Sequence, residues 1–203
     1  MGGIGMKALL VSFSGRKNPG NCIKTLEFVA DVLENKYVET SFMRILDYDI
    51  KPCFDCLYEC FDPEEICPVS DDVEDIYRVI ADQDMIFLSL PVYSGAPCSK
   101  YFAFRERSQS IFHDSKLFEK FDNVIKNYIV IGNQEAGGKQ AVEFITSEMK
   151  TKDNYILLQS HDYDQSSISG RLIVNQEVKK RLKKFTLSAL KNARKGYSDE
   201  LNF

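Results

Sequence analysis

The sequence has few of the residues that break regular structure, and no apolar run of membrane-spanning length. Its 203 residues include only 11 Gly and 6 Pro, which excludes collagen-like, low-complexity and disordered chains. No apolar stretch is long enough to cross a bilayer. The only two histidines, His113 and His161, stand far apart, and no Ser-His-Asp arrangement can be recognised. What is left is a globular domain of ordinary composition.

Charge of one sign is not in excess either. The chain has 26 basic and 30 acidic residues, a net charge of -4, which argues against a nucleic-acid-binding protein. The basic residues gather near the end of the chain, where positions 175–196 hold eight of them and one acid. Val178, Leu182 and Phe185 recur there at helical spacing, so we expect the solvated face of an amphipathic helix rather than a membrane or nucleic-acid surface.

Cysteine is scarce outside one short segment. Cys53, Cys56, Cys60 and Cys67 fall within 15 residues of one another, and the two others, which we expect to be small buried side chains, stand elsewhere at positions 22 and 98. The N-terminus has neither a secretory nor a myristoylation pattern, so we expect a cytoplasmic chain without a membrane anchor. In a reducing compartment, clustered thiols indicate metal or redox chemistry before structural disulfides.

Five apolar runs of strand length alternate with segments of helical periodicity. The expected strands are Ala8–Val11, Val38–Leu46, Met85–Leu90, Tyr128–Ile131 and Tyr155–Leu158. Most of these runs are apolar on both faces, which is typical of a parallel sheet covered by helices on both sides. Since no repeat, linker or change of composition interrupts the pattern, we predict a single doubly wound α/β domain over residues 1–203.

The loop after the first strand is rich in polar groups. Ser12, Ser14, Arg16 and Asn21 precede the predicted start of a helix, and ligands of an open parallel sheet bind at the carboxyl ends of its strands. Backbone N–H groups at a helix N-terminus suit a terminal phosphate. No Gly-x-Gly-x-x-Gly occurs there, so a dinucleotide turn is not expected. A capped polar turn would explain the same residues about as well.

Three loops together resemble a known family. Ser14-Gly15-Arg16-Lys17-Asn18-Pro19-Gly20-Asn21-Cys22 resembles the Ser-Pro-Arg-x-x-Gly-Asn-Thr loop of the NAD(P)H-dependent FMN reductases and flavodoxin-like quinone reductases, with Cys22 where Thr is common and Pro19 as an extra residue. Pro91-Val92-Tyr93-Ser94-Gly95 is similar to their Pro-Val-Tyr-x-Gly loop, and Ile131-Gly132-Asn133 with Gly137-Gly138 to their third loop. The resemblance runs from Met6 to about Lys195.

This resemblance implies a flavodoxin-like three-layer α/β/α sandwich with a five-stranded parallel sheet in the order 2-1-3-4-5. It implies that FMN is the cofactor, with its phosphate held by the first loop through Ser12, Ser14, Arg16, Asn21 and the backbone near Cys22. The isoalloxazine ring would lie on the second loop (Pro91, Val92, Tyr93, Ser94 and Gly95) and under the third (Asn133, Gly137 and Gly138). The residue types agree, because Tyr93 offers a flat face and Gly95 allows close approach of the main chain.

The activity implied is transfer of electrons from NAD(P)H through FMN to a quinone, a free flavin or another small acceptor, with no protein acid or base named as catalytic. The family implies a homodimer or homotetramer, and no nucleic-acid or membrane partner is expected. Two other functions are compatible with the motifs. One is an iron–sulfur flavoprotein that carries electrons between proteins, and the other is a flavodoxin-like binding module without turnover.

The clustered cysteines decide between these alternatives. Four thiolates at Cys53, Cys56, Cys60 and Cys67 would suit zinc or an iron–sulfur cluster. Iron–sulfur flavoproteins of the resembled superfamily carry a compact cysteine motif in this loop that binds a [4Fe–4S] cluster, with one residue fewer between the second and third cysteines. Nine acids and no base lie between positions 53 and 75, which disfavours thiolates unless a metal is bound. Reduced thiols with a packing role, a [4Fe–4S] cluster and structural zinc all stay open.

Overall fold

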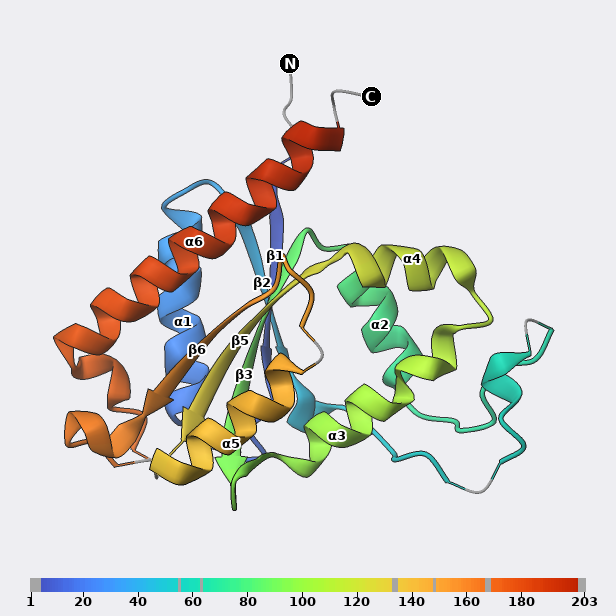
Figure 1. Ribbon diagram of the computed structural model, residues 1–203, viewed down its shortest axis with the longest axis horizontal. Helices are drawn as coiled ribbons and strands as arrows, with labels where there is room; N and C mark the ends of the chain where they lie inside the picture. The colour runs from blue at the N-terminus through green and yellow to red at the C-terminus, as the bar shows by residue number, and fades with distance from the viewer. Residues whose placement is uncertain are drawn as a thin grey trace.

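Five parallel strands form the centre of the computed structural model, which describes residues 5–54, 56–62, 64–132, 135–147, 149–166 and 169–200. Their order is β2-β1-β3-β5-β6 (Figure 1). The strands are β1 (Lys7–Ser12), β2 (Glu39–Arg44), β3 (Met85–Tyr93), β5 (Ile125–Gly132) and β6 (Asn154–Gln159). The predicted order 2-1-3-4-5 is confirmed, because the strand labelled β4 (Ala96–Pro97) is a two-residue antiparallel extension beside the end of β3.

Helices cover both faces of this sheet, as the apolar runs predicted. On one face α1 (Asn21–Glu34) and α6 (Gln176–Glu200) pack on Leu10 and Phe87. The opposite face carries Leu9, Val11 and Leu88, and it is covered by α2 (Val73–Ala81), α3 (Ser99–Glu106), α4 (Ser115–Asn123) and α5 (Glu135–Thr146). Short 3-10 turns complete the described elements: η1 (Ile45–Asp47), η2 (Glu59–Phe61), η3 (Arg107–Ile111), η4 (Ser160–Tyr163) and η5 (Leu172–Val174).

The structure corrects the sequence prediction in two places. Helix α4 was not expected, since Leu117 is its only buried residue. Its start is fixed by Asp114, whose Oδ1 accepts a hydrogen bond of 3.0 Å from the N–H of Leu117. Helix α5 begins at Glu135, so Gly137 and Gly138 lie in its first turn and not in a loop.

The cysteines at positions 53–67 lie in a segment that projects away from the sheet beyond α2 and α3 (Figure 1). A buried ion pair closes the base of this segment. The guanidinium of Arg107 contacts both carboxylate oxygens of Asp71, at 2.6 and 3.1 Å, and the two side chains are 2% and 1% exposed. Arg107 also donates to the carbonyls of Lys51 (3.1 Å) and Val69 (3.4 Å). Both ends of the segment are therefore tied to η3.

This ion pair predicts a specific loss of stability. Burial by itself raises the pKa of Asp71, but hydrogen bonds from Arg107 and two backbone N–H groups outweigh it and hold the pKa below its ordinary value. We expect Asp71→Asn to lower the free energy of unfolding by about 3 kcal/mol at neutral pH, because it leaves a buried guanidinium without its counter-ion. Asp72→Asn, which alters an exposed carboxylate that accepts from the N–H of Asp49, is the matched control and should cost under about 1 kcal/mol.

The pH dependence of the same comparison has a definite sign. A lowered folded-state pKa contributes stability above the unfolded-state pKa, and this contribution is lost as pH falls through the folded value. In urea titrations, the difference in free energy of unfolding between wild type and Asp71→Asn should therefore become smaller as the pH falls below the ordinary pKa of an aspartate. Equal stability of the Asp71→Asn and Asp72→Asn variants at neutral pH would contradict the role given to the pair.

Candidate functional site

A cavity of about 250 Å³ lies at the carboxyl ends of β1, β3 and β5. Three loops meet there, and seven of the thirteen predicted cofactor-binding residues line it. The lining residues are Ser14, Arg16, Gly20, Asn21, Cys22, Pro91, Val92, Tyr93, Ile131 and Gly132. Because parallel strands end at the same edge of a sheet, motifs that are far apart in the sequence become neighbours.

The first loop leads into α1 with its backbone donors directed at the cavity. Helix α1 starts directly after Gly20, which caps it without any side-chain hydrogen bond, and the first backbone bond of the helix runs from Lys24 N–H to the Gly20 carbonyl (3.1 Å). Amides of the first turn have no partner within a helix. The loop before it is tightened from within: the Oγ atoms of Ser12 and Ser14 accept from the N–H groups two residues further on, each at 3.4 Å.

Asn21 has a structural task that its motif did not reveal. Its side-chain Nδ2 donates to the carbonyl of Ser166 (3.2 Å), and its Oδ1 accepts from the N–H of Leu172 (3.1 Å). Between these partners, Gly170 has a φ of +70°, and a Cβ there would lie 3.3 Å from the carbonyl oxygen of Pro19. The connection from η4 to η5 thus packs closely against the first loop, and Asn21 joins the two.

Arg44 is a second residue that sequence reasoning missed. It ends β2, the neighbour of β1, and its Nη2 donates to the carbonyls of Arg16 and Lys17, both at 3.1 Å. This contact holds the backbone of the first loop while the Arg16 side chain stays exposed to solvent. Its position at the carboxyl end of a predicted strand was the only available signal.

The second loop is a tight hairpin. Tyr93 pairs with Ala96 across the two residues Ser94 and Gly95, whose φ angles are +49° and +80°. Two consecutive positive φ values are those of a type I′ turn, which suits the twist of a hairpin and favours Gly at its second position. The ring of Tyr93 is 56% exposed beside the cavity. Burial, followed by the neighbouring thiols of Cys22 and Cys98, raises its pKa.

The third loop is shorter than predicted. A Cβ on Gly137 would lie 3.6 Å from the backbone N of Gly95, so the first turn of α5 packs against the hairpin. A Cβ on Gly138 would come within 2.9 Å of Leu157 and closer still to Gln159, so α5 packs closely on the side chains of β6 at this position. Asn133 lies outside the described residues.

The two isolated cysteines are neutral thiols inside the protein, as expected. Burial raises the pKa of Cys22 to about 12 and also raises the pKa of Cys98. The Sγ of Cys98 donates to the carbonyl of Phe13 (3.4 Å). Both residues stand at helix starts, where a thiol pKa can fall, but burial outweighs that effect.

The clustered cysteines are not part of the core. All four are free; Cys53 is exposed and the other three are half-buried, and neither hydrophobic cluster contains them. The four free thiols therefore lie outside both hydrophobic clusters, and the three readings of the sequence stay predictions. Burial, followed by Glu106 for Cys53 and by Cys67 for Cys60, raises the pKa of these two thiols. Across the part of the chain that the structure describes, no three Cys, His, Asp or Glu side chains come together as a metal site. The donor set has the right chemistry for a cluster but not the arrangement.

Comparisons with known proteins point in one direction. The family model described as NADPH-dependent FMN reductase matches residues 6–143. Iron–sulfur flavoproteins are among the relatives: that of Methanocaldococcus jannaschii is 24% identical over 132 residues (64% of this chain, 65% of the relative). One from Archaeoglobus fulgidus is 27% identical over 121 residues (58% and 60%). The chain thus spans less than two thirds of the length of either.

Solved structures show the fold. The NAD(P)H:quinone oxidoreductase of Methanothermobacter marburgensis superimposes with a TM-score of 0.66 at 9% identity, covering 90% of this chain and 94% of the other. The FMN-dependent NADH-azoreductase of Bacillus anthracis gives 0.61 at 9% identity, covering 89% and 97%. These likenesses confirm the flavodoxin-like sandwich. Among the helices described, none is both long and apolar enough to span a membrane.

The link through Asn21 can be tested by mutation. We expect Asn21→Ala to lower the free energy of unfolding by about 1–3 kcal/mol, because it leaves the buried N–H of Leu172 without an acceptor. Asn35→Ala is the control: its Nδ2 donates to the Asp31 carbonyl at the exposed end of the same helix, and its loss should cost under about 0.5 kcal/mol. Urea titrations measure both, and equal losses would refute the link.

Proposed function

The chain belongs to the NADPH-dependent FMN reductase family, and on this basis we propose that it is an FMN-dependent oxidoreductase that takes electrons from NAD(P)H and reduces a small acceptor. The observation that carries the proposal is the cavity at the carboxyl ends of β1, β3 and β5, where the first and second predicted flavin loops meet. The cavity combines a set of anion donors with a flat aromatic surface.

The first loop fits a phosphate. The amides at the start of α1 lack a side-chain cap, the hydroxyl of Ser14 lies in the lining, and Arg16 adds a charged donor from solvent. Such a combination of helix N-terminus, hydroxyl and guanidinium is well suited to a terminal phosphate group. Arg44 and Asn21 act by positioning the loop, through its carbonyls and through the connection from η4 to η5 respectively.

The second loop fits a planar ring. Pro91, Val92 and the exposed face of Tyr93 supply an apolar surface, and Gly95 provides the positive φ of the turn that follows Tyr93. FMN, when bound, would supply the redox chemistry by accepting a hydride and passing the electrons on. The protein's part is to bind and orient, and no acid or base is required. Because the thiol of Cys22 stays protonated, it adds no negative charge next to the phosphate.

The donor and acceptor share one surface in this proposal. NAD(P)H docks at the open side of the cavity near Tyr93, and a quinone, a free flavin or a similar small acceptor follows it there. We propose a cytoplasmic homodimer or homotetramer, in which neighbouring subunits would cover part of an otherwise open flavin.

A second candidate function rests on the cysteine segment, residues 51–70. The names of the relatives and the four thiols favour an electron carrier with a [4Fe–4S] cluster, in which Cys53, Cys56, Cys60 and Cys67 would be the ligands. Since the described side chains do not form a metal site, the reaction proposed above does not involve a cluster. Structural zinc would need the same convergence of thiols.

Phosphate recognition gives the sharpest test of the binding mode. Arg16→Ala should weaken FMN binding about tenfold or more while leaving riboflavin binding unchanged, because only FMN carries the phosphate. Lys17→Ala is the control, since Lys17 is the adjacent exposed cation but does not line the cavity. Flavin fluorescence titrations measure all four affinities. An equal loss for FMN and riboflavin would contradict a phosphate contact.

The reaction is tested on protein purified without oxygen. We expect a flavin absorption spectrum that bleaches on addition of NADPH or NADH and returns when a quinone is added. Chemical analysis should find no stoichiometric iron or acid-labile sulfide. Stoichiometric iron and acid-labile sulfide with a broad brown absorbance would instead support the electron carrier. A colourless protein that does not take up FMN would support a binding module without turnover.

A further inference from the structure

A second, larger cavity of about 540 Å³ lies on the face of the sheet covered by α2, α3, α4 and α5. It shares no lining residue with the first cavity. On β3 its floor is formed by Ile86 and Leu88, whereas the first cavity begins at Pro91 and Val92. Leu88 and Pro91 are three positions apart along the strand, roughly 10 Å, so the two cavities are distinct.

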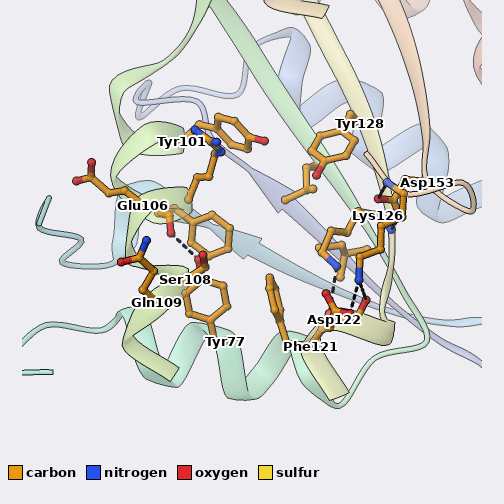
Figure 2. A pocket seen from close by; sticks show the side chains of 15 residues that line it. Tyr77, Tyr101, Glu106, Ser108, Gln109, Phe121, Asp122, Lys126, Tyr128 and Asp153 are labelled. Atoms are coloured by element: carbon orange, nitrogen blue, oxygen red, sulfur yellow. Dashed lines mark hydrogen bonds and ion pairs between the residues drawn. The ribbon is translucent and has the colours of Figure 1, made fainter. Parts of the chain in front are cut away.

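Five aromatic rings line this second cavity, together with polar and charged side chains (Figure 2). Tyr77 stacks on Phe104 with ring centroids 4.7 Å apart and meets Phe121 edge-on at the same distance. Tyr101 and Tyr128 face each other from α3 and β5, with centroids 6.5 Å apart and planes at 88°. Rings that are already fixed against one another present both faces and edges, which suits a flat aromatic guest.

One end of the cavity carries a cation without a carboxylate partner. Lys126 is half-buried, and its Nζ donates to the carbonyls of Phe121 and Val124, both at 3.1 Å. The nearby acids are engaged elsewhere: Asp122 pairs with Lys150, and the carboxylate oxygens of Asp153 accept from the backbone N–H groups of Lys126 and Lys150. Among the described residues, none forms an ion pair with Lys126. The ammonium also lies over the ring of Phe121, 4.5 Å from its centroid. An ammonium has three donors, and two of them go to the carbonyls, so the third can turn from the ring to a ligand.

The tyrosine hydroxyls add further donors at the same end. Lys126 and Tyr128 are two residues apart on β5, so their side chains leave the same face of the strand. Burial raises the pKa of Tyr101 to about 12 and that of Tyr128 well above its ordinary value, so both phenols stay protonated. The hydroxyl of Tyr77 donates to the carbonyl of Phe104 (2.5 Å), and the hydroxyl of Tyr128 donates to that of Tyr101. The hydroxyl proton of Tyr101 is therefore the one left for a ligand.

We propose that this cavity is a second ligand site, which binds a small aromatic carboxylate. The ring lies between the aromatic side chains over Ile86 and Leu88, and the carboxylate accepts from Lys126 Nζ and from the hydroxyl of Tyr101, which the hydroxyl of Tyr128 holds in place. A hydroxyl donor beside the positive charge of Lys126 favours an anion that accepts hydrogen bonds, such as a carboxylate. The walls select a planar apolar body. The site is independent of the proposed flavin site in both its residues and its location.

The test is a calorimetric titration of the FMN-saturated protein with benzoate. Cyclohexanecarboxylate, which keeps the charge without the aromatic ring, and benzyl alcohol, which keeps the ring without the charge, are the comparison ligands. We expect saturable binding of benzoate and clearly weaker binding of the other two. Lys126→Met should weaken benzoate binding about tenfold or more, and Tyr128→Phe, which keeps the ring, should weaken it less.

Lys152→Met is the matched control variant. Lys152 also donates to a carbonyl near the end of α4, that of Asn123 (3.0 Å), but it does not line the cavity. Its substitution should leave benzoate binding unchanged, and thermal melting of each variant establishes that it is folded.

Three results would overturn the proposal: no saturable binding at millimolar benzoate, equal affinity of wild type and Lys126→Met, or equal affinity for benzoate and cyclohexanecarboxylate. Binding to FMN-free protein that FMN abolishes would also overturn it, by placing benzoate in the first cavity. If the chain takes up no FMN, the proposed function fails, but the same titration on the FMN-free protein still tests this site.

Discussion

The parallel pairing of β1, β3 and β5 is the constraint on which both cavities depend. Backbone hydrogen bonds set Ser12 opposite Ser89, and Pro91 opposite Ile131, so the loops after these strands leave the sheet at one edge. The same register gives the strands two faces. One face buries its side chains under α1 and α6, and the other carries the aromatic cavity. Neither cavity requires irregular backbone within the sheet. Each is lined by side chains or loops that the pairing of the strands brings next to one another.

Irregular segments are held to this sheet by polar side chains that bind backbone groups. Arg44 holds the carbonyls of the first loop, Asn21 binds the connection from η4 to η5, and the Arg107–Asp71 pair closes the cysteine segment. A buried ion pair of this kind contributes less net stability than its Coulomb attraction suggests, because both charges lose their hydration. Its clearer effect here is to fix the positions of the two ends of the cysteine segment.

The fold could be predicted because it is encoded locally: each apolar run identified a strand, and the order followed from the resemblance. Helix α4 was missed because only Leu117 is buried. The first cavity was also predictable, since all ten of its lining residues lie in the three motifs and seven of them were predicted to bind the cofactor. Arg44, Gly170 and the partners of Asn21 were not, because their roles arise from contacts between distant segments. The second cavity left no trace in the sequence: Lys126 and Tyr128 lie where a strand was expected to begin.

The bonds of Asn21 also have a consequence for the order of events during synthesis. Its partners, Ser166 and Leu172, follow it by 145 and 151 residues. On the ribosome, where chains emerge from the N-terminus, the first loop exists long before the segment that fixes it. The first loop therefore takes its final form only after residue 172 has emerged, so that in the proposed function FMN would bind late in the maturation of the chain.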